Sequence, residues 1–186
     1  MYYHCSPISG LMRLKPQKPQ HFNKGALVYM TTSLPMALMY GIRNFEYTYG
    51  YTKDGQIYYE EYFPDALRIL YAGKSASLYE CAPQETKSTQ IPNEMVSPQP
   101  VKVLREIHIP DVMQALLEQE RQGKLVIRRY EQLSPDARNW ILQAEKSEIT
   151  KRGLLHAPSP MAAYMQLHYP QSWEAAILEE KETPED

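Results

Sequence analysis

Three short segments of the chain carry residue types that do chemistry in many proteins. The first, YHCS, places His4 near the end of a predicted N-terminal strand. The second holds Tyr29 in a predicted strand and Tyr40 in the helix that follows, eleven positions later. The third, IPNEMV, holds Glu94 within an apolar run. A histidine can hydrogen-bond a polar ligand, two aromatic faces can enclose a flat ring, and a carboxylate can stabilise a developing positive charge.

Sequence motifs of the common active sites are missing from the chain. It has no GxSxG nucleophile elbow, no GxxxxGK[ST] phosphate loop, no GxGxxG after a strand and no HExxH pair. Its five histidines show no metal-ligand spacing with one another, and two cysteines alone do not complete a structural zinc site. We therefore expect no metal cofactor.

Residues 1–109 predict a mixed α/β region that positions these side chains. Ala26–Met30 is an apolar run of strand length, and Ser33 is a good N-cap for a helix through Tyr40. Asp54-Gly55 is a hairpin turn signal. Further strands are predicted at 1–5, 45–51, 56–63, 76–81, 91–96 and 101–109, and a second helix at 66–71.

Residues 110–181 predict a helical extension. Ser134-Pro135 and Ser159-Pro160 are strong helix starts, with a serine as N-cap and a proline at the first helical position. The apolar residues of this part form a thin core for a bundle standing alone, so we expect the extension to pack on residues 1–109. The charged tail, 182–186, is expected to fray.

Taken together, the order and spacing of these segments resemble the ADP-ribosyltransferase superfamily, in particular its His-Tyr-Glu branch. That branch includes the poly(ADP-ribose) polymerases and the diphtheria-toxin-like enzymes. In the family one strand ends in His-Gly-Ser or His-Gly-Thr, a second strand and its following helix carry two tyrosines, and a late strand supplies a glutamate. The matching positions here are His4, Tyr29, Tyr40 and Glu94, and the resemblance covers 1–109. It implies an α+β fold with a split pair of sheets.

The resemblance also implies an activity: NAD, as substrate, is cleaved between nicotinamide and ribose, and ADP-ribose is transferred to an acceptor. On this reading Tyr29 and Tyr40 sandwich the nicotinamide ring, and the backbone at Cys5 holds its carboxamide. His4 hydrogen-bonds the adenosine-side ribose. Glu94 hydrogen-bonds the other ribose and steadies the oxocarbenium-like transition state. The acceptor is an unknown protein or small molecule.

The sequence departs from the family pattern at two positions. Cys5 stands where the family has a glycine, and Ala37 stands where a serine often bonds the carboxamide. These departures motivate an alternative, a catalytically inactive binding module on the same fold, with the region from Pro110 docking a partner. A third reading is an ordinary α+β domain, in which the tyrosines pack and Glu94 caps a turn.

Composition narrows the remaining function classes. The 186 residues have ordinary globular composition and a formal net charge of -2, so no basic excess points to nucleic acid. Neither a targeting segment nor a membrane-spanning run is visible, and we expect a cytoplasmic protein with free thiols. Cys5 and Cys81 are expected to be small buried hydrophobes. The tyrosines from Tyr47 to Tyr62 either wall a ligand cleft or form cross-strand pairs in a hairpin.

Overall fold

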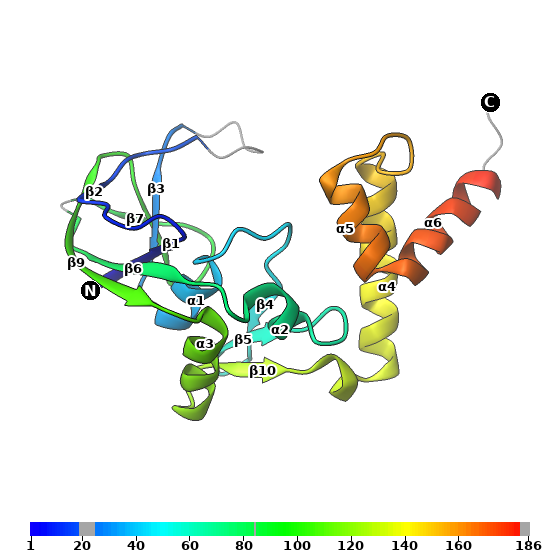
Figure 1. Ribbon diagram of the computed structural model, residues 1–186, viewed down its shortest axis with the longest axis horizontal. Helices are drawn as coiled ribbons and strands as arrows, with labels where there is room; N and C mark the ends of the chain where they lie inside the picture. Colours follow the sequence, from blue (N-terminus) through cyan, green and yellow to red (C-terminus); the bar gives the residue numbers. More distant parts are fainter. Residues whose placement is uncertain (19–24, 84, 183–186) are drawn as a thin grey trace. The chain divides into compact units, whose positions relative to one another are not determined.

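The computed structural model describes residues 1–18, 25–83 and 85–182 and shows an α+β protein with two sheets. The chain divides into two compact units. Unit 1 comprises Met1–Tyr59 and Leu67–Ile127, and unit 2 comprises Glu60–Ala66 and the chain from Arg128 onward. Figure 1 shows the strands in the N-terminal two thirds of the chain and helices α4, α5 and α6 at its C-terminal end.

The elements of the described chain have the following bounds. The strands are β1 (Tyr2–Ser6), β2 (Arg13–Leu14), β3 (Val28–Thr31), β4 (Tyr49–Tyr51), β5 (Ile57–Glu60), β6 (Ala76–Cys81), β7 (Lys87–Ser88), β8 (Glu94–Ser97), β9 (Val101–Ile109) and β10 (Val126–Arg128). The helices are α1 (Leu34–Met39), α2 (Ala66–Tyr71), α3 (Val112–Arg121), α4 (Pro135–Lys151), α5 (Pro160–His168) and α6 (Pro170–Glu182), with a 3₁₀ turn at Tyr130–Gln132.

The larger sheet, in unit 1, has the strand order β2-β9-β6-β1-β3-β8-β7. Strand β1 pairs with β6 along its whole length, from Tyr2 to Ser6. On its other side it pairs with β3 at a single position, Tyr3 with Thr31. Because a single residue pair supplies few of the hydrogen bonds of a strand ladder, the sheet is nearly divided between β1 and β3. The candidate residues His4 and Tyr29 flank this division.

The two faces of this sheet bury different sets of side chains. One face carries a hydrophobic cluster formed by Leu14, Val28, Met30, Tyr79, Cys81 and Val101. The other face lies under α1, whose residues from Pro35 to Met39 are all buried. Helix α3 packs against α1 and buries Val112 and Leu116 completely. Ser33 caps α1 by accepting a hydrogen bond from the Met36 backbone N–H, as the sequence predicts.

The smaller sheet has the order β10-β5-β4. Its β4–β5 hairpin turns at Asp54-Gly55, and Gly55 adopts a φ of 79°, which confirms the predicted turn. The strand predicted at 45–51 is shorter than expected and begins at Tyr49. The Tyr47 hydroxyl donates to the Ile42 carbonyl oxygen at 2.9 Å, and this bond holds the preceding residues in a loop.

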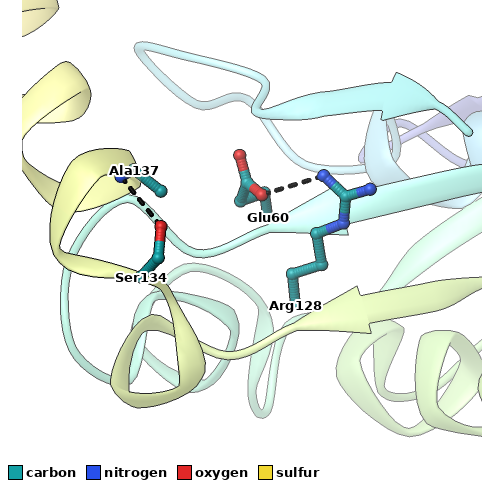
Figure 2. Close-up of polar contacts among 4 residues, drawn as sticks. All are labelled: Glu60, Arg128, Ser134 and Ala137. Atoms are coloured by element: carbon teal, nitrogen blue, oxygen red, sulfur yellow. Dashed lines mark hydrogen bonds and ion pairs between the residues drawn. The ribbon is translucent and has the colours of Figure 1, made fainter.

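Unit 2 is built on α4, α5 and α6. Ser134 and Ser159 accept hydrogen bonds from the backbone N–H groups of Ala137 and Ala162, which confirms both predicted N-caps. Figure 2 shows the Ser134 cap, and beside it the Glu60 carboxylate facing the Arg128 guanidinium at 3.1 Å.

Residues 60–66 form a strap that belongs to unit 2 although the residues on either side belong to unit 1. Within unit 2, the buried Glu61 carboxylate accepts a hydrogen bond from the Tyr130 N–H at 3.1 Å. The Phe63 ring stacks on His168 with a centroid distance of 4.3 Å. A charged residue and an aromatic residue of the strap therefore both have partners in the helical part of the chain.

The boundaries of the units differ in position from the boundary drawn on composition. Composition places it between 109 and 110, whereas the later part of unit 1 extends to Ile127 and includes α3. Of the predicted frayed tail, 182–186, only Glu182 is described, as the last residue of α6, and 183–186 lie outside the described residues.

Candidate site in unit 1

His4 lies half-buried on β1 and reaches across the division of the larger sheet. Its Nδ1 is 2.9 Å from the backbone carbonyl oxygen of Tyr29 on β3. Because a carbonyl oxygen only accepts, Nδ1 carries the proton in this bond. Burial lowers the pKa of His4 below its ordinary value, which favours the neutral ring. A neutral ring protonated at Nδ1 leaves Nε2 as an acceptor for a ligand hydroxyl.

Cys5, the residue after His4, is buried against the end of α1. A Cβ placed on Gly41 would lie 2.7 Å from the Cys5 Sγ and 3.1 Å from the Ala76 Cβ. The glycine thus permits a close approach between β1 and the segment that follows Tyr40. The chain neighbours of His4 and Tyr40 are in contact, so this approach fixes the distance between the two backbones that carry the candidate residues.

The two departures from the family pattern both point into this packing. The Cys5 side chain is 4% exposed and Ala37 is 2% exposed. The Cys5 thiol therefore packs beneath α1, and burial raises its pKa to about 12, so it stays protonated. Both cysteines are free and buried, as the sequence predicts.

Glu94 is the first residue of β8, beside the candidate tyrosine on β3. It pairs with Thr31, which pairs in turn with Tyr3 on β1. Tyr29 lies two positions before Thr31 and faces Val96, so Tyr29 and Glu94 are diagonal neighbours on one face of the β3–β8 pair. The Thr89 hydroxyl donates to the Glu94 Oε1 at 2.7 Å and orients the carboxylate.

Tyr40 belongs to a group of four tyrosines that we call the tyrosine cluster: Tyr40, Tyr47, Tyr49 and Tyr51. The Tyr40 and Tyr47 rings lie 4.4 Å apart between centroids, and the Tyr40 and Tyr49 hydroxyls are 3.1 Å apart. Tyr49 and Tyr51 follow edge to face at 6.4 Å. The alternating tyrosines of this segment thus gather around Tyr40. The sequence alone left their role open between walling a ligand cleft and pairing across a hairpin.

The charge of Glu94 acts on this cluster. Burial raises the pKa of Tyr40 above its ordinary value, and the hydrogen bond to Tyr49 and the Glu94 carboxylate raise it further. The pKa values of Tyr49 and Tyr51 are raised in the same way, by burial first and also by Glu94. The phenols of the cluster are therefore neutral, and the negative charge of the Glu94 carboxylate disfavours their ionisation.

Two hydrogen bonds that the sequence analysis did not foresee hold the turn before β8, one from the tyrosine cluster and one from the end of β3. The Tyr51 hydroxyl donates to the Pro92 carbonyl oxygen at 2.6 Å, and the Thr32 hydroxyl donates to Asn93 Oδ1 at 3.1 Å. Asn93 adopts a φ of 64° in a turn, so the strand predicted at 91–96 begins at Glu94 instead. Asparagine tolerates this backbone region better than most residues, and that was the available signal.

The structure connects the candidate residues in two groups. His4 meets the Tyr29 backbone, and Glu94 lies near Tyr40, while the β3–β8 register links Tyr29 to Glu94. The described residues show no ring contact between Tyr29 and Tyr40, and the rings packed against Tyr40 are those of Tyr47 and Tyr49.

A cavity of about 500 Å³ opens beside this group of residues in unit 1. Its side-chain lining includes Tyr3, Thr32, Tyr51, Gln56, Asn93 and Lys124. None of the five candidate residues from the sequence lines this cavity. Two lining residues connect it to Glu94, because Asn93 directly precedes Glu94 and the charge of Glu94 raises the pKa of Tyr51. The volume is within the range of small-molecule sites.

In the part of the chain that the structure describes, no three side chains of His, Cys, Asp or Glu are arranged to hold a metal ion. The helices of this part include none with the length and apolar character needed to cross a membrane. Comparison with known families and with curated proteins gives no match to the chain.

Proposed function

We propose that the protein is an ADP-ribosyltransferase-like enzyme that cleaves NAD at the nicotinamide–ribose bond and transfers ADP-ribose to an acceptor. The observation that carries the proposal is the placement of Glu94. Its carboxylate is oriented by Thr89, acts on the phenols around Tyr40, and stands one strand away from the Tyr29 backbone that anchors His4.

The proposed fold is the split two-sheet arrangement of that superfamily. Its support is the larger sheet itself, in which β1 and β3 share the single pair Tyr3 with Thr31. At this near-division the His4 side chain bonds the Tyr29 backbone, and the family resemblance places the substrate beside these two residues.

In the proposed reaction the bond between the ribose C1 and the nicotinamide nitrogen breaks, and its electron pair stays with the nitrogen. The ribose then carries oxocarbenium character. Glu94 stabilises this positive charge, and because the Thr89 hydroxyl already orients the carboxylate, little reorganisation is needed at that moment. The Nε2 atom of the neutral His4 ring accepts a hydrogen bond from a ribose hydroxyl.

The nicotinamide ring is proposed to stack on tyrosine. Tyr40 is partly exposed, at 37%, and stays neutral because the pKa of its phenol is raised. Stacking of a flat ring on such a face contributes about 0.5–1.5 kcal/mol beyond the area it buries. Tyr29, half-buried on the strand beside Glu94, supplies the second face.

A catalytically inactive binding module on the same fold is the second candidate, and one observation favours it. The Tyr47 ring already lies 4.4 Å from the Tyr40 ring, in a tilted arrangement. If this contact persists, it occupies a face that the nicotinamide would need.

Incubation of the protein with NAD separates the two candidates. The enzyme reading predicts release of free nicotinamide together with an NAD-dependent rise in the melting temperature, since a ligand that binds only the folded state stabilises it. Glu118→Gln, at a half-buried acid on α3 that pairs with Arg121 outside the candidate site, serves as a matched control and should leave both signals unchanged. Absence of both nicotinamide release and any NAD-dependent thermal shift would favour the inactive module.

A further inference from the structure

The cavity of unit 1 is built from two groups of residues with different contacts. One group, Thr32, Tyr51 and Asn93, surrounds the turn that leads into Glu94. The other group lies at the tip of the β4–β5 hairpin and after α3, where Gln56 Nε2 donates to the Gly123 carbonyl oxygen at 2.7 Å. The second group brings Lys124 to the cavity.

Charge in this lining has one sign. Among the described residues that line the cavity, Lys124 is the charged side chain, and the others are neutral. Lys124 is exposed and forms no ion pair with another described residue, so its ammonium group is available to a ligand. The Glu94 carboxylate, which follows the lining residue Asn93 in the chain, lies outside the lining and already accepts the Thr89 hydroxyl.

The positive charge of Lys124 and the negative charge of Glu94 favour one orientation of a ligand in the cavity. An anionic group is favoured at Lys124, and is disfavoured toward Glu94, whose negative charge repels it. A hydroxyl has the opposite fit, because a carboxylate accepts hydrogen bonds and can take a proton.

We propose that the cavity binds a small anion that bears a hydroxyl, with its phosphate or carboxylate at Lys124 and its hydroxyl toward Glu94, and that this ligand is the acceptor of ADP-ribose. The binding half of the proposal stands on the cavity alone, and the acceptor half rests on the proposed function. A protein arginine as acceptor is disfavoured, because Lys124 repels a cation.

In the proposed transfer step, the hydroxyl oxygen of the acceptor is the nucleophile. The acceptor oxygen forms a bond to the ribose C1 as the bond from C1 to the nicotinamide nitrogen breaks, and the electron pair of that bond leaves with nicotinamide. The hydroxyl proton passes to the Glu94 carboxylate and then to water. NAD and the hydroxyl compound are converted to nicotinamide, the ADP-ribosylated acceptor and one proton.

The binding half is tested without NAD by titrating the ¹⁵N-labelled protein at low salt with four matched probes. These are glycerol 3-phosphate, glycerate, neutral glycerol and cationic serinol. At least one anion should shift the amide signals of Gln56, Asn93 and Lys124, and should bind several-fold more tightly than glycerol. The stronger of the two anions identifies the group as phosphate or carboxylate.

Two variants locate the charge. Lys124→Gln should weaken binding of that anion about two- to fivefold, the range expected for one exposed ion pair. Lys102→Gln, the same change at an exposed position on β9 outside the lining, should leave it unchanged. Equal effects of the two variants, equal affinity for all four probes, or tightest binding of serinol would overturn the proposal.

The acceptor half is tested by adding NAD and measuring both free nicotinamide and the mass of the modified probe. The bound anion should gain ADP-ribose, and Lys124→Gln should reduce the yield of that adduct more than it reduces nicotinamide release. Nicotinamide release without an anion adduct overturns the acceptor assignment alone. Absence of nicotinamide release under every condition overturns that assignment together with the proposed function, while the titration still judges the binding half.

Discussion

Gly41→Ala tests the close approach that holds the end of α1 on β1. The added methyl would lie 2.7 Å from the Cys5 Sγ, 3.0 Å from the Leu38 carbonyl oxygen and 3.1 Å from the Ala76 Cβ. Two carbon atoms pack best at about 3.5–4.0 Å, so the Ala76 Cβ is too close. The Cys5 sulfur, a larger atom, is closer still, and the Leu38 oxygen is also within a distance that few Cβ atoms show. The Leu38 neighbour is backbone and moves little.

The expected cost follows from this crowding. Overpacking by a methyl group in a buried site typically destabilises a protein by about 1–3 kcal/mol. Replacing glycine with alanine returns about 0.4–1 kcal/mol by restricting the unfolded chain where the native backbone suits alanine. We therefore expect Gly41→Ala to lower the free energy of unfolding by about 2 kcal/mol. Gly25→Ala, at a described position with open space around the added Cβ, should be nearly neutral.

A double-mutant cycle with Cys5→Ala isolates the closest contact. Removing the Sγ relieves the 2.7 Å overlap but leaves the neighbours at Leu38 and Ala76. Gly41→Ala should therefore cost less in the Cys5→Ala background, with a coupling free energy of about 1 kcal/mol. Urea denaturation followed by circular dichroism measures all four proteins. A coupling below about 0.3 kcal/mol, within the usual error of additivity, would refute the proposed contact between the chain neighbours of His4 and Tyr40.

Tyr40→Ala should weaken NAD binding measured by calorimetry, because it removes a stacking face, and an unchanged Kd would exclude that role. Ser134→Ala should lower the free energy of unfolding by about 1 kcal/mol, because the Ala137 N–H loses its cap. Burial lowers the pKa of both His4 and His168. Below about pH 6.5 the unfolded chain therefore takes up protons that the folded chain does not, and the free energy of unfolding decreases as the pH is lowered. His4→Gln and His168→Gln should each reduce the change in melting temperature between pH 7.5 and 5. A pH dependence equal to that of the wild type would contradict the lowered pKa of the replaced histidine.

Local chemistry made much of the fold predictable. A serine followed by proline within the first helical turn marks the starts of α1, α4 and α5, because the side-chain cap and the fixed proline φ act within one turn. Strands β6 and β9 have the predicted bounds, 76–81 and 101–109, since each is a run of strand-forming residues ended by a proline or a turn.

Features that depend on distant partners were not predictable in the same way. The loop before Tyr49 exists because the Tyr47 hydroxyl finds the Ile42 carbonyl, a side-chain bond that alternation does not encode. The membership of 60–66 in unit 2 depends on partners far along the chain, such as Arg128. The same holds for the site, where the sequence supplied Glu94 but not its hydrogen bond from Thr89 or the cluster it faces.

Glu94→Gln, with NAD affinity and nicotinamide release measured on the same protein, tests whether the charge of Glu94 acts in the cleavage of NAD. The substitution keeps the shape of the side chain and can still accept the Thr89 hydroxyl, but removes the negative charge. NAD affinity should change little, because the ribose of bound NAD does not yet carry the oxocarbenium charge. Nicotinamide release should fall by about 10²–10³-fold, the loss expected for one electrostatic stabiliser of a transition state. Nicotinamide release at the wild-type rate would contradict a role for Glu94 in the reaction.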